Sequence, residues 1–182
     1  MKKHIKAVDA RGRKLGGETP LLCKPLVGRT RERVLAAAAG VLRQQPDLVE
    51  WRVDFFEAIH DTDAVIETAR ALRGAVAKRP VIFTRRAERG GGEQTAMGDA
   101  AVVEFYAAVA ASGLVDFIDF EMDNDPEHLR RVRESTRRHG IRLILSYHNL
   151  SYTPGQDFLV DRFLEAERLG ADVAMLQVMP RS

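Results

Sequence analysis

Short apolar runs alternate along the chain with longer segments whose apolar residues recur every three or four positions. The short runs are typical of β-strands, and the longer segments are typical of amphipathic helices. Strands that alternate with helices favour parallel βαβ units and an α/β fold. The predicted strands are 21–27, 48–55, 81–84, 114–121, 141–147 and 171–179, and the predicted helices are 30–44, 61–76, 99–112, 126–139 and 154–169.

The strand predicted at 48–55 is apolar on one face and charged on the other, since successive side chains point to opposite faces. A flat parallel sheet covered by helices would make both faces apolar. A barrel explains the charged face, because inward side chains become polar toward the mouth, where barrel sites lie. The apolar face holds Val49, Trp51, Val53 and Phe55, and the charged face holds Glu50, Arg52 and Asp54.

Polar residues in alternate positions, on one face of the strand, also occur at the ends of three further predicted strands. They are Thr84 and Arg86, then Asp119 and Glu121, and finally Ser146 and His148. The pattern therefore predicts a βα-barrel, of which about six strands are present.

The chain has 182 residues, which is the length of one domain but short of the roughly 250 residues of an eightfold βα-barrel. We expect a single, incomplete barrel domain over residues 1–182 whose six strands do not close. Residues 1–18 stand outside the alternating pattern and contain Gly12, Gly16 and Gly17. We expect a short hairpin there.

Composition narrows the protein class. Lys and Arg number 28 against 26 Asp and Glu, so the net charge of +2 gives no general signal for a polyanionic partner. The single cysteine, Cys23, excludes an internal disulfide framework and a cysteine-rich zinc site. No apolar run reaches the roughly 18 residues of a spanning helix, and no signal peptide follows Met1. We expect a soluble, cytoplasmic protein.

His148 is the best acid–base candidate, because it lies at a predicted strand end and histidine titrates near neutral pH. Glu50 and Arg52, with Arg86 on another strand, predict a pocket for a polar ligand, although a purely structural ion-pair ladder is the alternative. Metal-ligand spacing is absent. Met175 is most simply a core residue on this reading.

Two other segments invite functional interpretations that we do not favour. The glycine-rich segment 90–95 lacks the lysine of a phosphate-binding loop, so a mobile loop over the barrel mouth is preferred. The arginine-rich segment 130–138 is interpreted as a solvated helix face, and nucleic acid stays open as its alternative partner.

Several segments resemble those of type I 3-dehydroquinate dehydratases, and the resemblance covers nearly the whole chain. It implies a (β/α)8 barrel that converts 3-dehydroquinate to 3-dehydroshikimate in the shikimate pathway. It implies a homodimer with no metal or cofactor, and neither nucleic acid nor membrane as a partner. The segments are DLVEWRVD at 47–54, IFT at 82–84, GGEQ at 91–94, SGLVDFID at 112–119, SYHN at 146–149, GADV at 170–173 and VMP at 178–180.

The resemblance also implies residue roles. In that family a lysine forms an imine with the substrate ketone, and this imine is a sink for the electron pair left by proton removal. A histidine moves protons, and an acidic residue of the glycine-rich loop assists it. By position, Glu50, Arg52 and Arg86 would bind substrate hydroxyls, and His148 would be the acid–base residue.

Three positions depart from the family pattern. The imine lysine falls on Met175. The loop glutamate falls on Gly90, with Glu88 two positions earlier, and the serine of the first strand falls on Pro25, beside Lys24. The last two strands of the family, which carry an arginine, a serine and a glutamine for the substrate carboxylate, would lie beyond residue 182. We expect Lys24 to point outward and to form no covalent adduct.

Three hypotheses follow. The chain is a dehydratase in fragmentary or altered form, or an inactive relative that binds a shikimate-like ligand or a protein partner, or a structural module. The four polar site residues disfavour the structural module. Met175 bears on the choice between the other two hypotheses, because a thioether cannot form an imine. If the methionine was introduced by design, the parent protein is an enzyme. If the methionine is natural, the inactive relative is favoured. We expect little or no dehydratase turnover.

Overall fold

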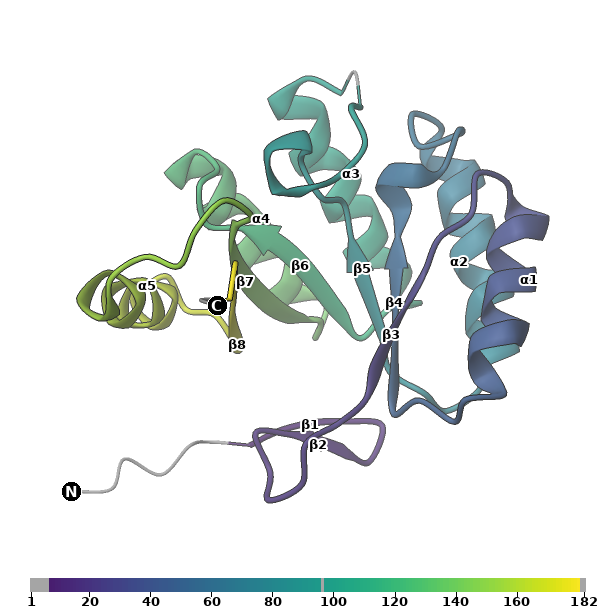
Figure 1. Cartoon of the computed structure of the whole chain (residues 1–182). Coiled ribbons are helices and arrows are strands. Elements are labelled where there is room, and N and C mark those ends of the chain that lie inside the picture. Colours follow the sequence, from purple (N-terminus) through teal and green to yellow (C-terminus); the bar gives the residue numbers. More distant parts are fainter. Residues whose placement is uncertain (1–6, 96, 181–182) are drawn as a thin grey trace.

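The computed structural model describes residues 7–95 and 97–180 and contains a curled sheet of six parallel strands with the order β3-β4-β5-β6-β7-β8 (Figure 1). Strand order equals chain order, which confirms the predicted succession of βαβ units. Among the described residues, the outer strands β3 and β8 pair only with β4 and β7, so the sheet is a half-barrel. The strands are β3 (Cys23–Leu26), β4 (Leu48–Arg52), β5 (Val81–Thr84), β6 (Phe117–Glu121), β7 (Arg142–Asn149) and β8 (Val173–Val178).

Each pair of neighbouring strands is connected through a helix on the convex side of the sheet (Figure 1). Local capping fixes where several helices begin. The side chain of Thr30 accepts a hydrogen bond from the Arg33 amide, and Asp125 does the same for the Glu127 amide, as the sequence predicts. The helices are α1 (Arg31–Leu42), α2 (Thr62–Val76), α3 (Asp99–Ser112), α4 (Pro126–Arg138) and α5 (Gln156–Arg168).

Of the six predicted strands, only 81–84 has the same bounds in the structure, and two of the differences affect the polar end of the sheet. The strand expected at 48–55 ends at Arg52, and η1 (Val53–Phe55) follows as a 3-10 turn closed by the Phe56 amide on the Val53 carbonyl, 2.9 Å. Asp54 therefore lies on a turn and not on the strand. In contrast, β7 extends past the predicted residue 147, because His148 pairs in register with Gln177 of β8.

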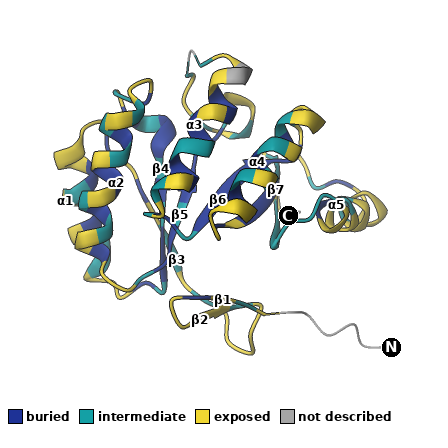
Figure 2. Cartoon of the chain, turned by 180° about the vertical axis from the view of Figure 1, so that it is seen from behind, coloured by how far each residue is buried: buried dark blue, intermediate teal, exposed yellow. Residues whose placement is uncertain are grey.

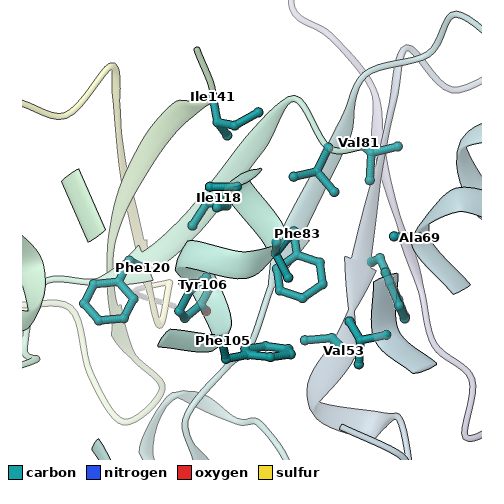
Figure 3. Close-up of a cluster of buried hydrophobic side chains, with 14 of the residues drawn as sticks. Val53, Ala69, Val81, Phe83, Phe105, Tyr106, Ile118, Phe120 and Ile141 are labelled. Atoms are coloured by element: carbon teal, nitrogen blue, oxygen red, sulfur yellow. The ribbon is translucent and has the colours of Figure 1, made fainter. Parts of the chain in front are cut away.

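The main core lies between the convex face of the sheet and the helices. Figure 2 shows that α1, α2 and α4 are buried along the side that faces the sheet and exposed along the other, whereas α5 is mostly exposed. Phe83 and Tyr106 lie at its centre (Figure 3). Phe83 makes edge-to-face contacts with Trp51 and Tyr106, with ring centroids 5.5 and 6.0 Å apart. Such contacts add specific geometry to the burial of apolar surface.

The concave face has an apolar layer at the amino ends of the strands. Leu48, Phe117 and Ile144 pack there against Ala10. Ala10 belongs to a hairpin of β1 (Val8–Ala10) and β2 (Arg13–Leu15), which are antiparallel. The hairpin covers this end of the concave face, and the opposite end carries the polar side chains.

Candidate active site

The polar side chains of the concave face lie at the carboxyl ends of the strands. The register places Thr84 of β5 beside Asp119 of β6, and Glu121 of β6 beside Ser146 of β7. His148 lies two residues beyond Ser146 and therefore on the same face of β7. Parallel strands end at the same edge of a sheet, so these groups gather at one mouth.

Arg86, which follows β5, is the centre of a buried polar network. Its Nη2 donates to Asp119 Oδ2 at 2.6 Å, and its Nη1 donates to Ser146 Oγ at 2.8 Å. Ser146 Oγ donates in turn to Asp119 Oδ1 at 2.5 Å, and Glu121 Oε1 lies 3.6 Å from Arg86 Nη1. Burial alone would lower the pKa of Arg86, but Asp119, Glu121 and Glu50 more than offset it and raise the pKa. Arg86 is thus a fixed cation.

His148 lies beside this cation, with Nδ1 3.2 Å from Arg86 Nη1. Burial of the imidazole and the charge of Arg86 lower the pKa of His148 to about 4. A charged imidazole next to a guanidinium is disfavoured by like-charge repulsion. His148 is therefore neutral near pH 7.

The contact with Arg86 also selects the tautomer of His148. A guanidinium has donors and no acceptor, so Nδ1 must be the unprotonated nitrogen and Nε2 carries the proton. Gln177 is the register partner of His148 on β8, and its side-chain amide acts on the ring in the direction that raises the pKa of His148. The imidazole is held between a cation and an amide.

Glu50 and Arg52 have different surroundings on β4. Arg52 donates to both carboxylate oxygens of Asp54, at 2.9 and 2.8 Å, and its guanidinium lies 5.0 Å from the centroid of the Phe55 ring. Glu50 is half-buried, and its side chain makes no hydrogen bond or ion pair with the rest of the described chain. Glu50 is therefore free to receive a donor from a ligand.

Met175 lies on β8 next to Ser146 in register, on the concave face. It is half-buried and packs against the apolar layer formed around Leu48 and Ile144. The thioether thus lies at the boundary between that layer and the polar network. Lys24 of β3 pairs in register with Val49, whose side chain belongs to the main core, so Lys24 lies on the convex face.

The glycine-rich loop folds closely over the network and contains η2 (Glu88–Gly90). A Cβ atom on Gly90 would lie 2.5 Å from Glu121 Oε1, and one on Gly92 would lie 2.0 Å from the Arg86 carbonyl oxygen. A side chain at position 92 therefore requires the backbone of the loop to shift, whereas one at position 90 requires the side chains of Glu121 and Arg86 to move. Glu88 itself is exposed.

Of the five residues predicted for the site, the structure brings Arg86 and His148 into direct contact. The other three, Glu50, Arg52 and Met175, lie on the same concave face. Within the described residues, none of them forms a hydrogen bond with Arg86 or His148. Sequence reasoning placed Asp119, Glu121 and Ser146 in the right phase but assigned them no role. It missed Gln177, because a neighbour across two parallel strands is visible only once the register is known.

The arginine-rich helix, a metal site and a membrane span were also considered from the sequence. On α4, Arg130 forms ion pairs with Glu127 and Glu134, Arg131 pairs with Glu104, and Arg133 Nη1 lies 2.6 Å from Asp172 Oδ2. Within residues 7–95 and 97–180, no three His, Cys, Asp or Glu side chains are placed to hold a metal ion together. None of the helices described is both long and apolar enough to cross a membrane.

Comparison with known proteins gives one consistent family. Residues 22–182 match the model of the type I 3-dehydroquinase family. A 3-dehydroquinate dehydratase of Albidiferax ferrireducens is 45% identical over 177 residues, which cover 97% of this chain and 67% of that protein. One of Geobacillus sp. is 42% identical, covering 97% and 68%.

Solved structures agree with the sequence comparisons. The crystal structure of 3-dehydroquinate dehydratase from Geobacillus kaustophilus superposes with a TM-score of 0.94 at 40% identity, covering 97% of this chain and 68% of that chain. The Clostridium difficile type I enzyme gives a TM-score of 0.93 at 28% identity, covering 97% and 69%. The barrel class and the resemblance predicted from the sequence are confirmed. This chain belongs to the type I 3-dehydroquinase family.

Proposed function

We propose that this chain binds 3-dehydroquinate on its concave face and turns it over slowly or not at all, because Met175 occupies the position of the imine-forming lysine. The observation that carries the proposal is the composition of the mouth. Glu50 lies on the same concave face as the fixed cation Arg86, whose pKa its charge helps to raise, and Arg86 in turn contacts the neutral imidazole of His148. These groups suit a ligand rich in hydroxyls.

Glu50 accepts hydrogen bonds from substrate hydroxyls in this proposal, and Arg52 donates them. Arg86 is almost fully enclosed, at 4% exposure, so it acts on the ligand mainly through its charge and through His148. His148 is the acid–base group. When the imidazole is neutral, it donates a hydrogen bond from Nε2. It can accept a proton at Nδ1 only after Nδ1 loses its hydrogen bond from Arg86.

Dehydration removes a proton next to the ketone and expels a hydroxyl. An imine with a lysine would hold the electron pair left by the proton, but a thioether cannot form one. The sequence contains no lysine after Lys78, and Lys24 lies on the convex face. The charge would have to develop on an unassisted carbonyl oxygen. Gly90, at the position of the loop glutamate, also leaves His148 without that partner.

The alternative function is an inactive relative that binds a shikimate-like ligand or a protein partner, and Met175 is the observation that favours it. We also propose a cytoplasmic homodimer, which light scattering after size-exclusion chromatography tests. Nucleic acid is not proposed as a partner, because acidic neighbours pair with three of the arginines of the basic α4 helix.

Calorimetric titration with 3-dehydroquinate and an assay for 3-dehydroshikimate test the proposal together. Binding without turnover is the expected result. Glu50→Gln should weaken binding about tenfold, the effect of one charge-assisted hydrogen bond, whereas Glu67→Gln on the exposed face of α2 should not change it. Ordinary steady-state turnover would contradict the impairment, and absence of binding would contradict the substrate assignment and leave the protein-partner alternative.

A further inference from the structure

Asp54 is a carboxylate whose position no functional role yet explains. It lies in the 3-10 turn after β4, and its side chain has no exposed surface. Arg52 donates two hydrogen bonds to it, from Nε at 2.9 Å and Nη2 at 2.8 Å. A planar guanidinium that bonds both oxygens of a carboxylate is held in one orientation.

The same carboxylate holds both ends of the glycine-rich loop. The backbone amide of Arg86 donates to Asp54 Oδ1 at 3.3 Å, and the amide of Glu93 donates to Oδ2 at 3.2 Å. Arg52 Nη2 reaches the loop as well, at 3.3 Å from the Gly91 carbonyl oxygen. The loop between Arg86 and Glu93 is therefore attached at its start, middle and end to one ion pair.

We propose that Asp54 is a positioning residue that fixes the glycine-rich loop and the Arg52 guanidinium in the geometry that receives the ligand. All four donors point at carboxylate oxygens, so an isosteric amide would turn an N–H group toward at least one of them. A buried donor left without an acceptor is costly. The effect on the ligand rests on the proposed function, whereas the effect on the loop does not.

Asp116 provides a matched control at the other end of the sheet. It lies just before β6 and accepts hydrogen bonds from Arg73 Nη2 at 2.5 Å, Arg11 Nε at 2.6 Å and the Val81 amide at 2.8 Å. Asp54 and Asp116 thus have the same chemistry, an aspartate that joins arginine and backbone donors. Asp116 lies at the amino end of the sheet, away from the mouth.

The test compares Asp54→Asn with Asp116→Asn by amide hydrogen exchange in peptides that span 84–95 and by titration with 3-dehydroquinate. Asp54→Asn should speed exchange in this segment about tenfold and weaken binding about tenfold, the size of one lost charge-assisted hydrogen bond. Asp116→Asn should leave both unchanged although it lowers the melting temperature. Unchanged exchange at 84–95 in Asp54→Asn, or an equal change in Asp116→Asn, overturns the proposal.

Failure of the proposed function and failure of the variant to fold can each be distinguished from failure of the Asp54 proposal. If the unaltered protein does not bind 3-dehydroquinate, the proposed function fails, and the exchange comparison still decides the role of Asp54. If Asp54→Asn does not fold, Arg52→Gln replaces it, since that variant keeps the carboxylate and removes its cation and the contact with Gly91. Faster exchange of the loop peptides then supports the proposal, and unchanged exchange overturns it.

Discussion

His148 Nδ1 lies 3.2 Å from a guanidinium nitrogen that can only donate, and this contact sets both the charge and the tautomer of the imidazole. Nitrogen-15 NMR should therefore show the Nε2–H tautomer at pH 7 and a single titration near pH 4. A His148→Asn variant assigns the signals. A protonated ring at pH 7, or the Nδ1–H tautomer, would contradict the network around Arg86.

The lowered pKa of His148 also makes stability depend on pH. The unfolded imidazole titrates near 6.5 and the folded one near 4, so the unfolded chain binds more protons between these values. The native state is therefore destabilised progressively as pH falls from about 6.5 to about 4. Urea unfolding across this range should show a steeper loss in the unaltered protein than in His148→Asn, and equal slopes would argue against the shift.

Sequence reasoning reached the site residues through the alternation of side chains along strands. Glu50 and His148 were recognisable because each lies on the polar, inward face of a predicted strand whose other face is mainly apolar. Asp54 was assigned to the same phase, although it acts from a turn. The hydrogen bond from the Glu93 amide to Asp54 joins segments 39 positions apart, and no local pattern encodes such a pairing.

Among the elements, the starts of α1, α2 and α4 are each fixed by a single capping side chain. Asp61 accepts a hydrogen bond from the Ala64 amide at 3.0 Å and begins α2. Asp61→Ala should lower the free energy of unfolding by about 1 kcal/mol. Asp63→Ala, in the first turn of the same helix, loses only its interaction with the helix dipole, about 0.3 kcal/mol. Urea denaturation measures both, and equal losses would show that the cap is not the cause.

Helix bounds were predicted more closely than strand bounds. Capping residues and terminal glycines lie next to the helix ends they determine, as Asp125 and Gly140 do around α4. A strand ends where its partner stops pairing. Thus β4 ends at Arg52, opposite Thr84 at the end of β5, although the apolar alternation continues to Phe55. The end of β4 is therefore determined by β5, and the sequence of β4 alone does not reveal it.

At the scale of the molecule, one aromatic cluster joins the sheet to its helices. Phe83 is fully buried and contacts Trp51 and Tyr106 edge-to-face. Phe83→Ala should lower the free energy of unfolding by about 3–5 kcal/mol, through lost burial and the cavity that remains. Phe163→Ala on α5, where the ring is 48% exposed, should cost no more than about 0.5 kcal/mol. Similar losses for the two variants would show that the cluster is not the core.

We propose that this member of the type I 3-dehydroquinase family has the polar mouth of the site but no amine to form an imine. Incubation with 3-dehydroquinate and borohydride, followed by peptide mass spectrometry, tests it most directly. The unaltered protein should show no reduced adduct on any lysine, whereas Met175→Lys should show one at position 175, because that side chain faces the concave side beside Ser146. A reduced adduct in the unaltered protein, on Lys24 or on another lysine, would contradict the account.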